Sequence, residues 1–344
     1  MSSVRPVPET VGLPGEELDL HDAGEVLHDH AGWPLLRESF TRFRFGDGFS
    51  HARGFGFQLA LATVPMVIAM TGLAAAIGAE HVSEVVARTA VALSPAGSDE
   101  VVEQIVQGAQ EQAGAGDEAP REEAGELALV LGLLVSFAAM TTAFAQLERG
   151  ANRIYGTERD RPSLVKYVRA GVLTVVAGTP MTTGLLLIVA GRPFQDAVEQ
   201  VYGWPDTVHL VFTVGRWPVG LLLLLLAVTV LFRFAPRRRQ PGVSWLVLGA
   251  SVTVLGWLAA SGLLAVYVAA DSFDGTYGPL TAVMALLVWA YLTGIALLGG
   301  VAVTAQAEAR RAGQRNPRQP DSDGDGVLDG AGARQVSSGP PGAG

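Results

Sequence analysis

The chain has 344 residues, of which 49% are apolar, and its mean hydropathy is positive at +0.33. Its formal net charge of −9 argues against a nucleic-acid-binding protein, which would need a basic face. Cysteine is absent, so disulfides and thiolate metal sites are excluded. These figures favour one helical membrane bundle with soluble tails over two soluble domains.

Residues 1–31 are acidic and contain few apolar side chains, which predicts a disordered N-terminal tail. They lack a basic start followed by an apolar run, so we expect no cleavable signal peptide. His21, His28 and His30 are possible metal ligands in this tail. The alternative is that they reflect only the composition of a disordered segment.

The segment 33–49 has the pattern of an amphipathic helix. Its apolar side chains fall near one face, which is formed by Leu35, Leu36, Phe40 and Phe43. Basic side chains fall toward the other face, which is formed by Arg37, Arg42 and Arg44. Such a segment is suited to lying at an anionic membrane surface before the first span.

Six apolar segments are long enough to cross the hydrocarbon core of a bilayer, which takes roughly 20 helical residues. They cover about residues 54–78, 126–146, 168–190, 208–232, 243–269 and 279–303. We therefore predict an all-α, polytopic membrane protein whose six transmembrane helices lie in a domain spanning residues 32–306.

The C-terminal tail, residues 307–344, is rich in Gly, Pro and Arg and is predicted to be disordered. Its stretch from Asp321 to Asp325 matches the opening of a calcium loop. An EF-hand also needs a Glu at the twelfth position, where this chain has Gly332. A solvated acidic tail is therefore the alternative interpretation.

Basic residues are sorted between the two sides of the predicted membrane domain. If the N-terminus is cytoplasmic, all Lys and Arg residues fall on the cytoplasmic side except Arg88, Arg121, Arg192 and Arg216. By the positive-inside rule, this predicts that both termini are cytoplasmic.

Two motifs carry a family resemblance. The first is Ala151-Asn152-Arg153-Ile154-Tyr155-Gly156, followed by Arg161-Pro162. The second is Tyr277-Gly278, which precedes a helix carrying Trp289, Tyr291, Gly299 and Gly300. Together with a proline in the first span, these motifs resemble the YihY/BrkB family (UPF0761) of bacterial inner-membrane proteins, over roughly residues 35–305.

The resemblance implies a multi-pass protein of the bacterial plasma membrane whose function is poorly defined in the family itself. The family usually continues Gly-Ala-Glu-Leu-Asn at the end of the last helix. This chain departs from that pattern, because Gly300 is followed by Val301-Ala302-Val303.

Family members were once described as a tRNA-processing ribonuclease, so an enzymatic function has to be weighed. Metal-assisted hydrolysis needs clustered His and Asp ligands, whereas the six histidines of this chain are scattered. A phosphate-cradling glycine loop and a nucleophile elbow are also missing. We therefore predict no enzyme, no catalytic residue, no cofactor and no metal site.

Prolines near the centres of two spans suggest a transport pathway. Interrupted helices often form midplane substrate sites in transporters, and the candidate pathway residues are Pro65, Thr179, Pro180, Thr182 and Thr183. Ordinary helix kinks are the alternative. We expect no charged residue to be buried in a span, which disfavours coupling to an ion gradient.

The first motif is also a candidate site for anionic lipid headgroups at the cytoplasmic face, through Asn152, Arg153, Tyr155, Gly156, Arg161 and Pro162. The alternative is that its basic residues only fix the topology. Tyr277 and Gly278 form a candidate outer turn with a gating contact. The small-residue pairs Gly256/Ala260 and Ala290/Gly294 are predicted helix-packing faces.

We conclude from the sequence that the protein is a transporter or a flippase-like protein for an envelope lipid or amphiphilic solute. The alternative is a non-transporting scaffold that organises envelope partners. The expected partners are the lipid bilayer and anionic headgroups, with homo-oligomers left open and no nucleic acid.

Overall fold

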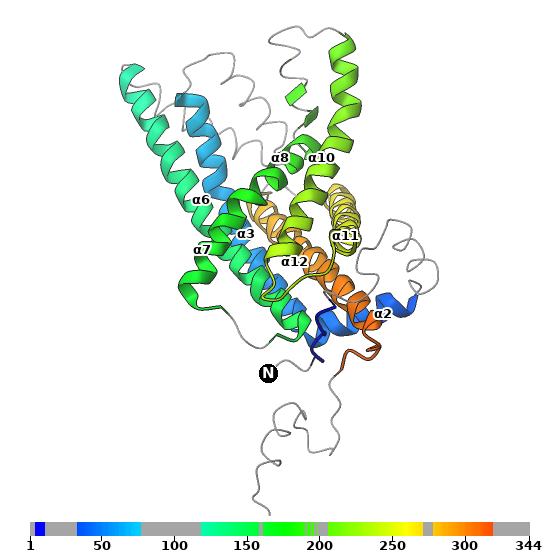
Figure 1. The fold of residues 1–344 in the computed structure, drawn as a ribbon. Coiled ribbons are helices and arrows are strands. Elements are labelled where there is room, and N and C mark those ends of the chain that lie inside the picture. The colour runs from blue at the N-terminus through cyan, green and yellow to red at the C-terminus, as the bar shows by residue number, and fades with distance from the viewer. Residues whose placement is uncertain are drawn as a thin grey trace, which may run out of the picture.

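The computed structural model describes residues 4–10, 33–76, 118–157, 161–189, 191–192, 194–195, 198, 206–270 and 278–318. Within these ranges the regular elements are helices, apart from one isolated bridge between Val4 and Arg318. The helices are α2 (Trp33–Phe45), α3 (Gly48–Ala76), α6 (Glu118–Tyr155), α7 (Ser163–Val176), α8 (Gly178–Val189), α10 (Asp206–Phe234), α11 (Val243–Ala270) and α12 (Gly278–Arg311). The long helices form a bundle, and α2 lies across its lower end (Figure 1).

Five helical segments of the described chain are long and apolar enough to cross a membrane. They are Gly125–Tyr155, Ser163–Ile188, Thr207–Phe234, Val243–Tyr267 and Val283–Arg311. This confirms the predicted polytopic helical membrane protein. Helix α3, which corresponds to the first predicted span, has 29 residues but is not one of these five segments.

The outer surface of the bundle is apolar. Leu134, Val211, Leu222 and Leu263 expose 60%, 72%, 65% and 73% of their surface, respectively. Soluble monomers rarely expose contiguous apolar surface on this scale. Lipid is the environment in which such a surface is stable.

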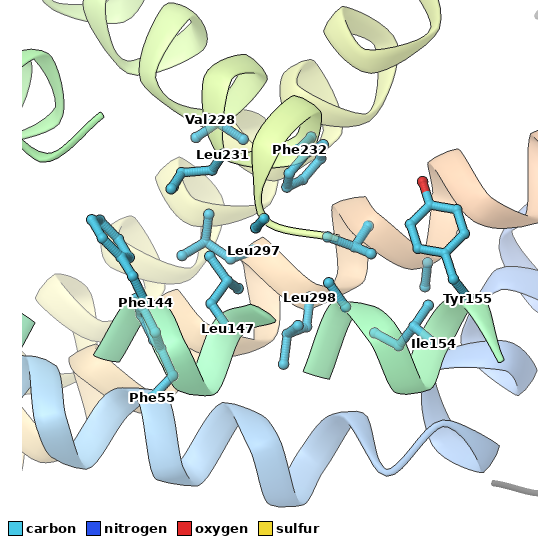
Figure 2. Packing of buried hydrophobic residues seen from close by; sticks show 14 of the residues in the cluster. Phe55, Phe144, Leu147, Ile154, Tyr155, Val228, Leu231, Phe232, Leu297 and Leu298 are labelled. Carbon is cyan, nitrogen blue, oxygen red and sulfur yellow. The ribbon is translucent and has the colours of Figure 1, made fainter. Parts of the chain in front are cut away.

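The main hydrophobic cluster joins the long helices α3, α6, α10, α11 and α12. It includes Phe55 of α3, Phe144 of α6, Leu231 of α10 and Leu297 of α12, all at most 1% exposed. Figure 2 shows these side chains converging between the helices. The cluster therefore fixes the positions of helices that are distant in the sequence.

Small residues allow backbones to touch where α3 crosses its neighbours. A Cβ atom added at Gly132 of α6 would lie 2.6 Å from the carbonyl oxygen of Pro65, and one added at Gly294 of α12 would lie 2.7 Å from that of Ala52. The predicted packing face at Ala290 and Gly294 is thus confirmed. A Cβ at Gly256 would have no neighbour nearer than 3.9 Å, so this glycine makes no close contact.

The predicted third span is divided in the structure. Helix α7 ends at Val176 and α8 begins at Gly178, with Ala177 between them. Pro180 explains the break, because it has no N–H to give to the carbonyl of Val176 and its ring crowds that carbonyl. Pro65, in contrast, lies inside the continuous helix α3, where the Ser136 hydroxyl donates to the carbonyl of Ala62 at 2.9 Å.

Parts of both predicted tails lie against the bundle. Helix α12 continues to Arg311, beyond the expected domain boundary at residue 306, and residues 312–318 are also described. At the other terminus, Val4, Val7 and Thr10 are buried. The remainder of both tails lies outside the described residues.

Helices α11 and α12 touch through a reciprocal pair of glycines, which provides a test of the packing. A Cβ at Gly300 would lie 2.6 Å from the carbonyl oxygen of Gly249 and would also collide with the Thr253 hydroxyl. We expect Gly300→Ala to lower the stability of the bundle by about 1–3 kcal/mol through overpacking. Thermal unfolding in detergent measures the change.

The adjacent Gly299 is a matched control, because a Cβ there would meet nothing within 4 Å. Gly299→Ala should leave stability unchanged or raise it by up to about 1 kcal/mol, since Ala favours the helix. Equal destabilisation by both variants would contradict the packing described here.

Candidate functional site

A cavity of about 60 Å³ lies at the centre of the bundle. Side chains from α3, α6, α8, α10, α11 and α12 line it, and they include Phe55, Met140, Phe144, Met181, Thr182, Leu185, Leu224, Val228, Thr253, Trp257, Trp289 and Thr293. The described helices long enough to span a bilayer therefore converge on one space.

The wall of this cavity is apolar and carries no charge. Its lining includes no Asp, Glu, Lys, Arg or His side chain. The hydroxyls of Thr253 and Thr293 donate to carbonyls of their own helices, at 3.1 and 2.9 Å. The indole N–H of Trp289 donates to Ser261 at 3.2 Å. These three polar groups are bonded within the protein and most of the remaining lining is hydrocarbon, so the wall is suited to a hydrocarbon group rather than an ion.

Only one predicted pathway residue, Thr182, lines the cavity. Thr179 and Thr183 are exposed on α8, and Pro180 lies beside the break before that helix. Pro65 lies at the contact between α3 and α6. The structure therefore does not bring these five residues together.

The cavity residues of α11 and α12 were not predicted from the sequence. Thr253 and Trp257 are four residues apart, as are Trp289 and Thr293, so each pair shares a helix face. The two tryptophan rings meet edge to face, with centroids 6.4 Å apart. The four-residue spacing of a threonine and a tryptophan could have indicated a shared helix face in each case. It does not indicate which helices face each other.

The first motif clamps the end of α6 to the loop between α10 and α11. The side-chain oxygen of Asn152 accepts the backbone N–H of Arg237 at 2.7 Å. Arg161 donates to the carbonyls of Ala235 and Pro236 at 2.9 and 3.1 Å, and it pairs with Glu148 at 2.7 Å. These side chains are therefore engaged in holding the fold.

The residues Val4–Thr10, which we call the N-terminal strap, cross the same end of the bundle. The N–H groups of Arg5 and Val7 donate to the carbonyls of Pro317 and Tyr155, at 2.9 and 3.1 Å. The hydroxyl of Thr10 donates to Glu308 of α12 at 3.1 Å. The strap thus joins the end of α6 to the end of α12.

Arg238 links the N-terminal strap to the bundle. Its guanidinium donates to the carbonyl of Pro8 at 3.1 Å and pairs with Glu308 at 2.7 Å. The same guanidinium lies over the ring of Tyr155, 4.6 Å from the centroid. Arg238 and Glu308 are both nearly buried, which strengthens their pairing relative to a surface ion pair.

Arg42, which the sequence pattern placed on the polar face of α2, is fully buried. It donates to Gln306 at 2.8 Å and to the carbonyls of Ile154 and Arg5 at 3.1 and 3.2 Å. Burial lowers the pKa of Arg42 to about 10. The guanidinium remains charged at neutral pH and ties α2, α6, α12 and the strap together.

Several other predictions lie outside the described residues. They include Tyr277 of the candidate outer turn, the histidines His21, His28 and His30, and the stretch from Asp321 to Asp325. Gly278 is the first residue of α12. Within the described chain, no three His, Cys, Asp or Glu residues gather in a group that could hold a metal ion.

The family described as Virulence factor BrkB matches residues 39–325. The chain belongs to this BrkB family. It is 24% identical over 280 residues to the ribonuclease-like protein YfkH of Bacillus subtilis (strain 168), covering 80% of this chain and 96% of YfkH. It is 27% identical over 163 residues to a UPF0761 membrane protein of Halorhodospira halophila (strain DSM 244 / SL1), covering 46% of this chain and 34% of that protein. No solved structure matches the chain.

The match confirms the BrkB resemblance seen in the sequence motifs. Two glycines of those motifs, Gly156 and Gly300, are required by the structure. Gly156 has φ +74°, and Gly300 touches the backbone of α11. In this BrkB-family chain these two motif residues therefore shape the turn after α6 and the contact between α12 and α11.

Gly156 provides a test of the strap. A Cβ there would lie 2.7 Å from the Cα atom of Pro6, whereas a Cβ at Gly313, which has a similar φ of +76°, would meet nothing within 4 Å. Both Ala variants should lower the stability by about 1–2 kcal/mol, because Ala is unfavourable at a positive φ. Gly156→Ala should cost about 1–3 kcal/mol more, because it also pushes against the strap.

Thermal unfolding measures the difference, and limited proteolysis reports release of the strap. Cleavage within residues 4–10 should become faster in Gly156→Ala and remain unchanged in Gly313→Ala. Identical behaviour of the two variants would mean that the strap does not rest on Gly156.

Proposed function

We propose that this BrkB-family protein binds a lipid or amphiphilic solute in the central cavity and moves it across the bacterial plasma membrane. The observation that carries the proposal is the convergence of α3, α6, α8, α10, α11 and α12 on one apolar space. Transporters and lipid carriers place their sites between bundle helices in this way. The proposal includes no catalytic step.

The uncharged lining supports an apolar substrate portion over an ion. A cavity of about 60 Å³ is too small for a whole lipid, so the described conformation corresponds to a closed state. The break at Ala177 supplies a place where α8 can move relative to α7. Helix movement there would enlarge the cavity without breaking a continuous helix.

The name of YfkH mentions a ribonuclease, and we do not extend that activity to this chain. A nuclease would need clustered His and Asp side chains to activate a water molecule. The sequence does not provide such a cluster near the motifs. The carboxylates Glu148 and Glu308 pair with arginines at the end of the bundle.

We also propose that α3 is a sixth span and that both termini are cytoplasmic. Basic side chains from several elements meet at one end of the bundle, including Arg42, Arg161, Arg169, Arg233, Arg238 and Arg310. The positive-inside rule assigns that end to the cytoplasm. Anionic headgroups are the expected neighbours of its exposed basic side chains.

Filling the cavity tests the transport proposal. Leu185 lines the cavity, whereas the next residue, Leu186, is 40% exposed on the outside of α8. Leu185→Trp should slow the movement of a headgroup-labelled phospholipid across vesicle membranes by about tenfold or more, a barrier change of at least roughly 1.4 kcal/mol. Leu186→Trp should leave the rate unchanged.

The measurement is the protection of the label from a membrane-impermeant quencher in vesicles containing purified protein. Wild-type protein that moves no lipid above the protein-free rate would refute transport and leave the scaffold alternative. Equal rates in wild type and Leu185→Trp would show that movement does not use the cavity.

The orientation can be measured separately, because the chain has no native cysteine. Two exposed positions suit single cysteines: Thr207 near the start of α10, and Arg239 in the loop that follows the end of α10. In intact cells an impermeant thiol reagent should label Thr207→Cys, and it should label Arg239→Cys only after permeabilisation. Labelling of both from outside would reject the proposed topology.

A further inference from the structure

Arg216 is a half-buried charged residue inside a candidate span, although the sequence predicts no buried charge in a span. It belongs to the segment Thr207–Phe234 of α10. At 1.5 Å per residue it lies roughly 15 Å along the helix from Asp206. Ionisable residues at such depth are costly and usually have a functional partner.

The guanidinium of Arg216 is incompletely satisfied. Its Nε and Nη1 atoms are buried and have no hydrogen-bond partner. The guanidinium carbon lies over the ring of Trp217, 5.9 Å from the centroid. A buried N–H without an acceptor is unfavourable unless a ligand or water supplies the acceptor.

The surroundings of Arg216 are built to leave room for its side chain. A Cβ at Gly191 would lie 3.1 Å from its Cδ atom and 3.4 Å from its Nη1 atom. Gln195, which is 2% exposed, holds this segment to α10 by donating to the Thr213 hydroxyl at 2.9 Å and to the His209 carbonyl at 3.2 Å. Gly191 therefore lies directly against the Arg216 side chain, and Gln195 fixes the segment that carries this glycine to α10.

The same helix face leads from Arg216 to the cavity. Gly220, Leu224 and Val228 follow Arg216 at four-residue spacing, and the last two line the cavity. Gly220 packs against α8, since a Cβ there would lie 2.7 Å from Ile188. Leu224 is roughly 12 Å along the axis from Arg216. One end of this seam between α8 and α10 is therefore cationic, and the other is apolar.

We propose that Arg216 binds the phosphate group of an amphiphile whose hydrocarbon chain extends toward the central cavity. The inference that the chain enters the cavity rests on the proposed function, whereas the phosphate site rests on Arg216 itself. A planar guanidinium with free N–H donors matches a phosphate group. The phosphate could belong to a lipid headgroup or to a free anion, and the experiment separates these sources.

The test is ligand binding to the purified full-length chain in detergent micelles, followed by native mass spectrometry or by intrinsic tryptophan fluorescence. The probes are phosphatidylglycerol, diacylglycerol with the same chains, and inorganic phosphate. Wild-type protein should bind phosphatidylglycerol at least about tenfold more tightly than diacylglycerol. In Arg216→Gln this ratio should fall to about one.

Arg192 is the matched control, because it is an exposed arginine beside Gly191. Arg192→Gln should keep the wild-type ratio, and Arg216→Lys should recover part of it. Gly191→Ala, which crowds the guanidinium without removing its charge, should reduce the ratio. An unchanged ratio in Arg216→Gln, or an equal loss in Arg192→Gln, would overturn the proposal.

Inorganic phosphate distinguishes the two sources. Competition with phosphatidylglycerol at millimolar phosphate, abolished by Arg216→Gln, would identify a free-anion site, whereas no competition would support a lipid headgroup. Binding in micelles does not depend on transport. If wild-type protein prefers phosphatidylglycerol over diacylglycerol and Arg216→Gln does not, but no lipid moves in vesicles, only the proposed function is refuted. If lipid moves but Arg216→Gln keeps the wild-type preference, only the phosphate site is refuted.

Discussion

Direct backbone contact between helices is the constraint on which this bundle depends. Lipid gives helices no hydrophobic reason to associate, so close van der Waals packing has to hold them together. Glycines permit it at the crossings of α3 with α6, α8 with α10, and α11 with α12, through Gly132, Gly184, Gly220, Gly249 and Gly300. A methyl group at these positions would separate the helices and open the apolar space between them.

A network of buried polar contacts joins several elements at one end of the bundle. There the N-terminal strap, α2 and the ends of α6 and α12 are joined through Arg42, Arg238, Gln306 and Glu308. The family pattern has a Glu and an Asn after the glycine, and this chain lacks both at residues 301–303. Gln306 and Glu308 follow within the same helix and are both buried. Polar contacts therefore hold the strap, α2, α6 and α12 together at this end, whereas the middle of the bundle is held by apolar packing and close backbone contacts.

The spans could be predicted because lipid imposes a simple rule on the sequence: uncharged segments of sufficient length. The ends of the helices could not be predicted in this way, because the helical hydrogen bonds of α6 and α12 continue through charged residues such as Arg153 and Arg310. The break at Ala177 follows from Pro180 and was recognisable in advance. The motif containing Asn152 and Arg161 was also recognisable, but its contacts with residues 235–237 depend on tertiary structure.

The cavity and the buried charges were not predictable from local patterns. Thr253 and Trp289 belong to different helices, and only the packing brings them to one space. Arg42 reads as a surface residue because its partners, Gln306 and the carbonyl of Ile154, lie far away in the chain. Arg216 falls within the predicted span 208–232, but the sequence does not show that its Nε and Nη1 atoms are buried.

The N-terminal strap has a consequence for how the protein is made. Thr10 and its acceptor Glu308 are 298 residues apart, so the strap cannot dock until α12 has been synthesised and inserted. Until then the ends of α2 and α6 lack the contacts that join them to α12. A truncated chain that stops before α12 would therefore keep its other helices but lose the acceptor of the strap and the partner of Arg42.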